Sequence, residues 1–114
     1  QLTPVLTAED VSIMQGQVCQ VGVARPVKEY IAKIIAETRA SSNIAIGVSP
    51  RGAVALQRAS QARAAMAGRD FATPDDVKAI ALPVLRHRIV VRSSEADAAS
   101  KYLEAILSTV PVPL

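Results

Sequence analysis

Residues 49–77 read SPRGAVALQRASQARAAMAGRDFATPDDV, and this stretch decides the fold class. It contains two helix starts of the same design, Ser49-Pro50 and Thr73-Pro74, in which a hydroxyl side chain can cap the helix and proline occupies its first turn. The segment between them is rich in alanine, the strongest helix former, and Gly68 is placed to end that helix. The stretch therefore predicts two successive helices joined by a short turn.

Apolar residues recur at helical spacing on both sides of this stretch. Upstream, they predict one helix over residues 8–18 and another over residues 26–39. Downstream, Ser94 with Asp97 supplies the cap of a last helix. Together with the two central helices, these make five.

Two local features interrupt the helical pattern. Pro83 lacks a backbone N–H and crowds the preceding turn, so the helix that begins at Pro74 is expected to break or kink there, with residues 84–87 forming a separate short turn. Residues 44–48 are interpreted as an apolar link, and residues 88–91 have room for one short extended segment. The predicted fold is accordingly all-α, a small five-helix bundle that forms one domain over residues 1–114.

The composition fits one compact domain. Of the 114 residues, 50% are hydrophobic and 20% are charged, which is enough for an ordinary core. Only 3% are aromatic, so small and branched aliphatic residues must carry the packing, as suits closely approaching helices. In the central helix, one side carries Ala55, Ala59, Ala62 and Met66, and we expect that side to pack against a neighbour.

Charge and cysteine content narrow the function classes. The net charge of +3 is spread along the chain, so it does not imply nucleic-acid binding. No apolar stretch approaches the roughly 18 residues that span a bilayer, and no membrane span is expected. Cys19 is the only cysteine and has no disulfide partner, which fits a reducing compartment and predicts a cytoplasmic protein.

Residues that could carry chemistry are few. The chain has no G-x-x-x-x-G-K-[ST] phosphate loop and no strand that ends in paired acids, so it cannot form a complete nucleotide site alone. We expect no catalytic residue and no metal site in it. The lone histidine, His87, is interpreted as structural, bonding to the backbone or capping the end of its helix.

Arg51 is the best candidate for binding a ligand. It lies in the first turn of a capped helix, beside free N–H groups and the positive end of the helix dipole, where an anion can bind. A guanidinium group matches phosphate geometry and stays charged near neutral pH. On the residues alone, a solvated or ion-paired side chain stays open as the alternative. Gly52 is expected to loosen this turn and to make its order depend on a neighbouring domain.

More arginines follow on the same helix. Arg58 lies two turns beyond Arg51 on the same face, while Arg63 and Arg69 bracket the helix end. They form either a basic stripe toward phosphates or an acidic partner, or a salt-bridged face toward solvent. Arg58 is the secondary candidate for a phosphate or subunit contact.

Four motifs stand in a familiar order: Gly-Val-Ser-Pro-Arg at 47–51, Ala-Gly-Arg-Asp-Phe at 67–71, Thr-Pro-Asp-Asp-Val at 73–77 and Val-Leu-Arg-His-Arg at 84–88. In that order and spacing they resemble the C-terminal helical lid of MoxR-family AAA+ ATPases, with magnesium-chelatase ATPase subunits as more distant relatives. The resemblance covers about residues 5–113. It implies that a phosphate-loop (P-loop) ATPase domain precedes this chain in a longer polypeptide and is absent from it.

The resemblance also implies a function. In that family the arginine of Ser-Pro-Arg is the sensor-2 residue, and this role falls on Arg51, with Ser49 and Pro50 forming the helix start. The lid closes over ATP and Mg²⁺ held by the parent protein and couples hydrolysis to chaperone-like remodelling or metal-centre maturation of partner proteins. This chain alone is expected to bind no cofactor and to have no activity. The implied partners are its own P-loop domain, neighbouring subunits of a homo-oligomeric ring and proteins of the von Willebrand factor A type.

Two other functions compete with this one. The chain could be a stand-alone α-helical interaction module that docks another protein through its alanine-lined helix. A helix-turn-helix nucleic-acid binder is disfavoured, because the helix from Pro74 starts acidic and is otherwise largely apolar, so no nucleic-acid partner is expected. A phosphate loop upstream in the parent reading frame would decide for the lid.

Overall fold

The computed structural model describes residues 16, 18 and 20–113. In this part of the chain lie four helices, α2 (Arg25–Ala40), α3 (Pro50–Met66), α4 (Pro74–Leu85) and α5 (Ala98–Thr109), and two short strands, β1 (Ile44–Ile46) and β2 (Val90–Val91). The fold is mainly helical, which confirms the predicted class, although five helices were expected. Most of the helix predicted over residues 8–18 lies outside the described residues. Gly16, Val18 and Gln20 are described, and all three are helical.

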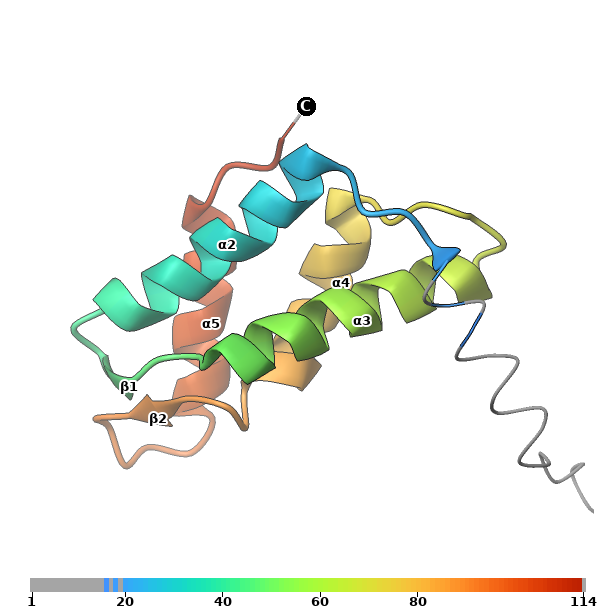
Figure 1. Cartoon of the computed structure of the whole chain (residues 1–114). Coiled ribbons are helices and arrows are strands. Elements are labelled where there is room, and N and C mark those ends of the chain that lie inside the picture. The colour runs from blue at the N-terminus through green and yellow to red at the C-terminus, as the bar shows by residue number, and fades with distance from the viewer. Residues whose placement is uncertain (1–15, 17, 19, 114) are drawn as a thin grey trace, which may run out of the picture.

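The four helices enclose one core. α2 packs against α3, α4 and α5, and α4 also packs against α3 and α5. In Figure 1, α2 and α3 cross the molecule, with α5 behind α2 and α4 behind α3. Each helix contributes to the largest fully buried side chains, which include Tyr30, Ile34, Leu56, Leu85 and Leu103. The apolar stripe of α2 is buried as its spacing predicts.

The buried side of α3 is not the one predicted. The side with Ala55, Ala59 and Ala62 is only half-buried, and Met66 is 89% exposed. The core-facing side carries Gly52, Leu56, Ser60, Gln61 and Ala64. Leu56 offers more apolar area than any alanine, so its burial sets the orientation of the helix. Ser60 is accommodated there because its hydroxyl donates to the carbonyl of Leu56 at 2.8 Å.

The predicted starts of α3 and α4 and the predicted end of α3 are confirmed. The Ser49 hydroxyl accepts the N–H of Gly52 at 3.2 Å. Thr73 and Asp76 form a capping box, in which the Thr73 hydroxyl accepts the N–H of Asp76 and the Asp76 carboxylate accepts the N–H of Thr73. Gly68 follows α3 with a φ of 79°, the left-handed conformation that glycine adopts without strain.

Pro83 does not break its helix, and residues 84 and 85 continue it, so the predicted break and separate turn are wrong. α4 runs through Pro83 and ends at Leu85. Because Pro83 lies in the last turn, its missing N–H removes only a bond near the end of the helix. Both Pro83 and Ala79, whose carbonyl loses that bond, are exposed, so water can satisfy the carbonyl.

The start of α5 also differs from the prediction. The helix begins at Ala98 after Asp97, which has a φ of 62° and whose side chain makes no capping bond. Ser94 does not cap the helix. Aspartate tolerates the left-handed conformation better than most residues, so here it makes a sharp turn of the chain. Burial of Ala98 and Leu103 then sets the orientation of α5.

The short extended segment expected near residues 88–91 is confirmed as β2, but its partner was not foreseen. β2 pairs with β1 in an antiparallel two-stranded sheet, with Ile44 opposite Val91 and Ile46 opposite Val90. The residues interpreted as a simple link between α2 and α3 therefore form a strand. This pairing ties the connection before α3 to the connection after α4.

The segment before α2 is fastened to the other end of α3. Gly22 donates its N–H to the carbonyl of Asp70 at 2.8 Å and accepts the N–H of Ala72 at 2.9 Å. The side-chain amide of Gln61 donates to the carbonyl of Val21 at 2.8 Å. The chain thus enters the helical domain beside the end of α3, whereas β1 and β2 lie beside its start (Figure 1).

Candidate functional site at the start of helix α3

Two side chains of α2 hold the start of α3. The N–H of Val48 donates to the Thr38 hydroxyl at 3.1 Å, and Arg39 Nε donates to the carbonyl of Val48 at 2.9 Å. Glycine is required at position 47, because a Cβ there would stand 2.7 Å from Arg39 Cγ and 2.9 Å from Arg39 Cα. Both backbone polar groups of Val48 are therefore bonded within this chain, and the first turn of α3 is fixed in place.

Gly52 tightens this turn, whereas the sequence led us to expect that it would loosen it. The residue is buried, and a Cβ on it would stand 2.5 Å from Val48 Cγ1 and 3.4 Å from Arg88 Cδ. The absence of a side chain lets Val48 and the stem of Arg88 close over the first turn. The order of the turn thus has a source inside this domain.

Arg51 stands exposed in that turn. The Ser49 hydroxyl accepts the N–H of Gly52, the Ser49 carbonyl accepts the N–H of Ala53 at 3.1 Å, and Pro50 has no N–H. Among the described residues, neither the backbone N–H nor the guanidinium of Arg51 has a partner. An anion here would therefore meet the Arg51 side chain and one backbone donor, fewer than the several free N–H groups expected.

Arg88 is a residue of this site that the sequence analysis missed. Its Cδ lies against Gly52, which brings its guanidinium, two bonds further out, near the first turn of α3. Its N–H donates to the carbonyl of Leu85 at 2.8 Å, which fixes the turn after α4. Arg88 ends the Val-Leu-Arg-His-Arg motif, but nothing local in that motif indicates that it meets Ser-Pro-Arg in space.

Arg58 keeps its predicted place on the outer side of α3. It is exposed and lies beside a surface hollow of about 330 Å³, which Val18, Val54, Gln57, Arg58 and Gln61 line. The spacing between Arg51 and Arg58 places both on one side of the helix, as expected. The structure does not bring Arg58 to the first turn, so it is a neighbour of the site rather than part of it.

Arg63 and Arg69 do not form a basic stripe with Arg51. Both bind Asp76, whose side chain is fully buried, with N–O distances of 2.7 Å. Hydrogen bonds from Arg69, then from Thr73 and Arg63, hold the pKa of Asp76 well below its ordinary value, against the opposing effect of burial. These two arginines join the end of α3 to the start of α4, so of the two alternatives left open for them the salt-bridged one holds, with the buried Asp76 as their partner.

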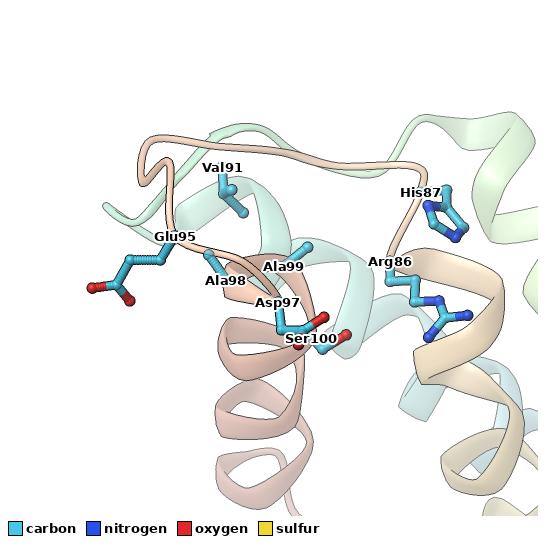
Figure 2. Close-up of a pocket in the computed structure, with 8 residues that line it drawn as sticks. All are labelled: Arg86, His87, Val91, Glu95, Asp97, Ala98, Ala99 and Ser100. Carbon is cyan, nitrogen blue, oxygen red and sulfur yellow. The ribbon is translucent and has the colours of Figure 1, made fainter.

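A second concavity lies between the end of α4 and the start of α5. It has a volume of about 320 Å³ and is lined by Arg86, His87, Val91, Glu95, Asp97, Ala98, Ala99 and Ser100. Figure 2 shows Arg86 and His87 on one side, Asp97 and Ser100 at the start of α5, and Glu95 pointing away. His87 is exposed, and no hydrogen bond to it exists among the described residues, so its predicted backbone bond is not observed.

The described residues hold no group of three His, Cys, Asp or Glu side chains that could bind a metal ion. In the same part of the chain, no helix is both long enough and apolar enough to cross a membrane.

Comparison with known proteins points to one family. The family model described as AAA lid domain matches residues 36–109, more than half of the chain. The chain is 37% identical to YeaC of Bacillus subtilis, over 99% of this chain and 36% of that protein. It is 37% identical to protein MoxR of Methylorubrum extorquens, over 59% of this chain and 21% of that protein. It is 28% identical to chaperone MoxR1 of Mycobacterium tuberculosis, over 99% of this chain and 33% of that protein.

A solved structure shares the fold. The crystal structure of a "putative ATPase" from Cytophaga hutchinsonii superposes with a TM-score of 0.82 at 28% identity, covering 93% of this chain and 36% of that one. The chain thus spans about a third of the length of the relatives that it matches along its whole length.

Proposed function

Because the chain belongs to the AAA lid domain family, as a C-terminal helical lid of the MoxR type, we propose that it closes over ATP held by a P-loop domain of the same polypeptide. In this proposal Arg51 is the sensor-2 residue that reaches the terminal phosphates. The observation that supports this role is that Arg51, in the first turn of α3, has no hydrogen-bond or ion-pair partner among the described residues.

The geometry supports a role in sensing charge. The turn is held rigidly by Thr38 and Arg39, so Arg51 is presented at a defined place rather than on a mobile loop. A preorganised guanidinium stabilises charge that develops on a phosphoryl group without further reorganisation. Loss of the γ-phosphate removes one of its ligands, so ATP favours the closed lid and hydrolysis favours opening.

Arg88 supplies a second positive charge in the same proposal. Its stem packs on Gly52, so its guanidinium lies close to the helix end that Arg51 serves. Two cations at a positive helix end repel one another, and a polyphosphate offsets this repulsion. We assign Arg88 a supporting role in phosphate binding and Arg51 the principal one.

The proposal requires further components of the ATPase that this chain does not supply. Mg²⁺ and most of the ATP would be bound by the P-loop domain, because the described residues offer no cluster of acidic side chains for a metal. Neighbouring subunits of a ring are the expected further contacts. The name chaperone MoxR1 of one relative supports chaperone-like remodelling of a partner protein. Metal-centre maturation, and von Willebrand factor A-type proteins as partners, are proposed from the family resemblance alone.

The test is ATP turnover and ATP affinity of the full-length polypeptide with Arg51→Ala. Removing a charged contact to the transition state is expected to lower turnover by about ten-fold or more. Arg25→Ala is the matched control, because Arg25 also lies in the first turn of a proline-containing helix and is 90% exposed. Arg63 would be a poor control, since it binds the buried Asp76.

Normal turnover in both variants would make Arg51 an ordinary surface residue. The stand-alone interaction module would then become the better account of this chain.

A further inference from the structure

Gln61 is a buried polar residue of α3 that bonds far from its own helix. Its side chain lies on the core-facing side and is 8% exposed. The neighbouring Ser60, which is also buried, donates to a carbonyl of the same helix. The Gln61 amide instead donates to the carbonyl of Val21, forty positions away in the sequence. Ordering a long side chain costs entropy, and this bond adds nothing within α3. It therefore serves to join α3 to another part of the chain.

The bond is one of three hydrogen bonds that hold the segment before α2. Besides the bond from Gln61 to Val21, Gly22 bonds in both directions to the connection between α3 and α4, through Asp70 and Ala72. Val21 is 5% exposed and packs in a small apolar cluster apart from the main core. Figure 1 shows this segment, in blue, against the end of α3. We call these three hydrogen bonds the entry clamp.

Helix α3 connects the entry clamp to Arg51. Gln61 follows Arg51 by ten positions on the helix, which corresponds to roughly 15 Å along its axis. Thr38 and Arg39 hold the other end of that span. The position of Arg51 relative to the segment before α2 is therefore set through α3, and it depends on how firmly Gln61 holds that segment.

We propose that Gln61 is a positioning residue for Arg51, because it fixes the orientation of the lid on the chain that leads to the P-loop domain. This inference rests on the proposed function, in which that domain precedes this chain. Without the Gln61 bond, the lid takes up more orientations relative to the ATPase domain, and Arg51 reaches the phosphates in a smaller fraction of them. A displacement of about 1 Å from the productive geometry can lower a rate by as much as about a hundred-fold.

The test uses the full-length polypeptide with Gln61→Met. Methionine matches glutamine in length and flexibility but has no N–H, so the buried carbonyl of Val21 loses its partner. ATP turnover is expected to fall by roughly five-fold, less than in Arg51→Ala because the arginine is still present. Ser60→Ala is the matched control, since it removes a buried hydrogen bond from the next position of α3 without touching the segment before α2. Its turnover should equal that of the wild type.

Combining Gln61→Met with Arg51→Ala distinguishes positioning from a merely structural role. If Gln61 acts through Arg51, Gln61→Met should lower turnover by less than about two-fold in the Arg51→Ala background, because the effects of groups that act as a unit are not additive. An unrelated structural loss would instead multiply the effect of Arg51→Ala. The same decrease in both backgrounds would therefore overturn the proposal.

Amide hydrogen exchange gives a readout that does not depend on activity. The N–H groups of Gly22 and Ala72 both donate within the entry clamp, and we expect both to exchange faster in Gln61→Met but not in Ser60→Ala. Exchange at wild-type rates in Gln61→Met would contradict the proposal, because the clamp would then not depend on Gln61. Should Gln61→Met fail to fold, Val21→Ala loosens the same clamp from the other side, with the same expected changes in exchange and turnover.

Arg51→Ala alone separates this inference from the proposed function. If Arg51→Ala lowers turnover while Gln61→Met behaves as Ser60→Ala does, the positioning role fails and the sensor role stands. If Arg51→Ala is normal, the sensor role fails, and the positioning role fails with it.

Discussion

The two ends of α3 use arginine in opposite ways. At the end of the helix, Arg63 and Arg69 each reach the buried carboxylate of Asp76 at 2.7 Å. At its start, Arg51 is exposed and without a partner among the described residues. The same residue type therefore holds the fold together at one end and is left available at the other.

The helix dipole makes this difference informative. Cations near the C-terminal end of a helix are favoured, so Arg63 would be tolerated there even without Asp76. Cations at the N-terminal end are disfavoured, and α3 places Arg51 in its first turn with Arg88 beside it. A feature that weakens the isolated domain but suits an anion is what a ligand-binding role predicts.

The largest effect is expected at the end of α3. Asp76→Asn removes the charge that two arginines share and leaves them without a counter-ion in a partly buried place. We expect the free energy of unfolding to fall by about 3 kcal/mol, the lower range for breaking a buried ion pair from one side. Urea unfolding followed by circular dichroism measures this change.

Asp75→Asn is the control for that substitution. Asp75 is exposed in the same first turn of α4 and makes no ion pair among the described residues, so it contributes its interaction with the helix dipole and a weaker, longer-range attraction to Arg69. A loss of about 0.5 kcal/mol is expected. If both variants lose equally little, the arginine cluster does not hold the fold, and the comparison between the two ends fails.

Acid should weaken the same cluster in a graded way. The pKa of Asp76 is lowered in the folded state, chiefly by the hydrogen bond from Arg69, so the stabilisation is complete above the unfolded pKa of about 3.9 and declines as the pH falls below it. By pH 3, the wild type is expected to lose about 1 kcal/mol more than Asp76→Asn loses over the same range. Unfolding curves from pH 7 to pH 3 give both slopes, and parallel slopes would contradict the lowered pKa.

Features that depend on a few neighbouring residues were predictable from the sequence. The caps at Ser49 and Thr73 and the end of α3 at Gly68 are correct, because a cap joins atoms within about four residues. The effect of Pro83 was predicted wrongly, because the free energy that a proline costs a helix depends on how close the proline lies to the end of that helix. Ser94 was misjudged because packing of α5, rather than a cap, sets where that helix begins.

Contacts between distant residues could not be predicted in this way. The partner of β2 is β1, and the partner of Arg63 is Asp76, thirteen positions away. Arg88 reaches Gly52 only because the turn after α4 lies against the start of α3. The place of Arg51 at an exposed helix start was local and predictable, whereas the arginine beside it belongs to the tertiary fold.

The smallest effect tests the start of α3 directly. Arg51→Gln removes a cation from the positive end of the helix while keeping a long polar side chain, so the nucleotide-free protein is expected to gain a few tenths of a kcal/mol, roughly 0.3, in stability. ATP affinity should fall at the same time, which isothermal titration of the full-length polypeptide measures. Arg25→Gln is the control and should be neutral, because Arg25 has Glu29 one turn away at 3.4 Å to offset its charge. A clear loss of stability in Arg51→Gln would mean that Arg51 holds the fold as Arg63 does, and the two ends of α3 would then no longer differ in kind.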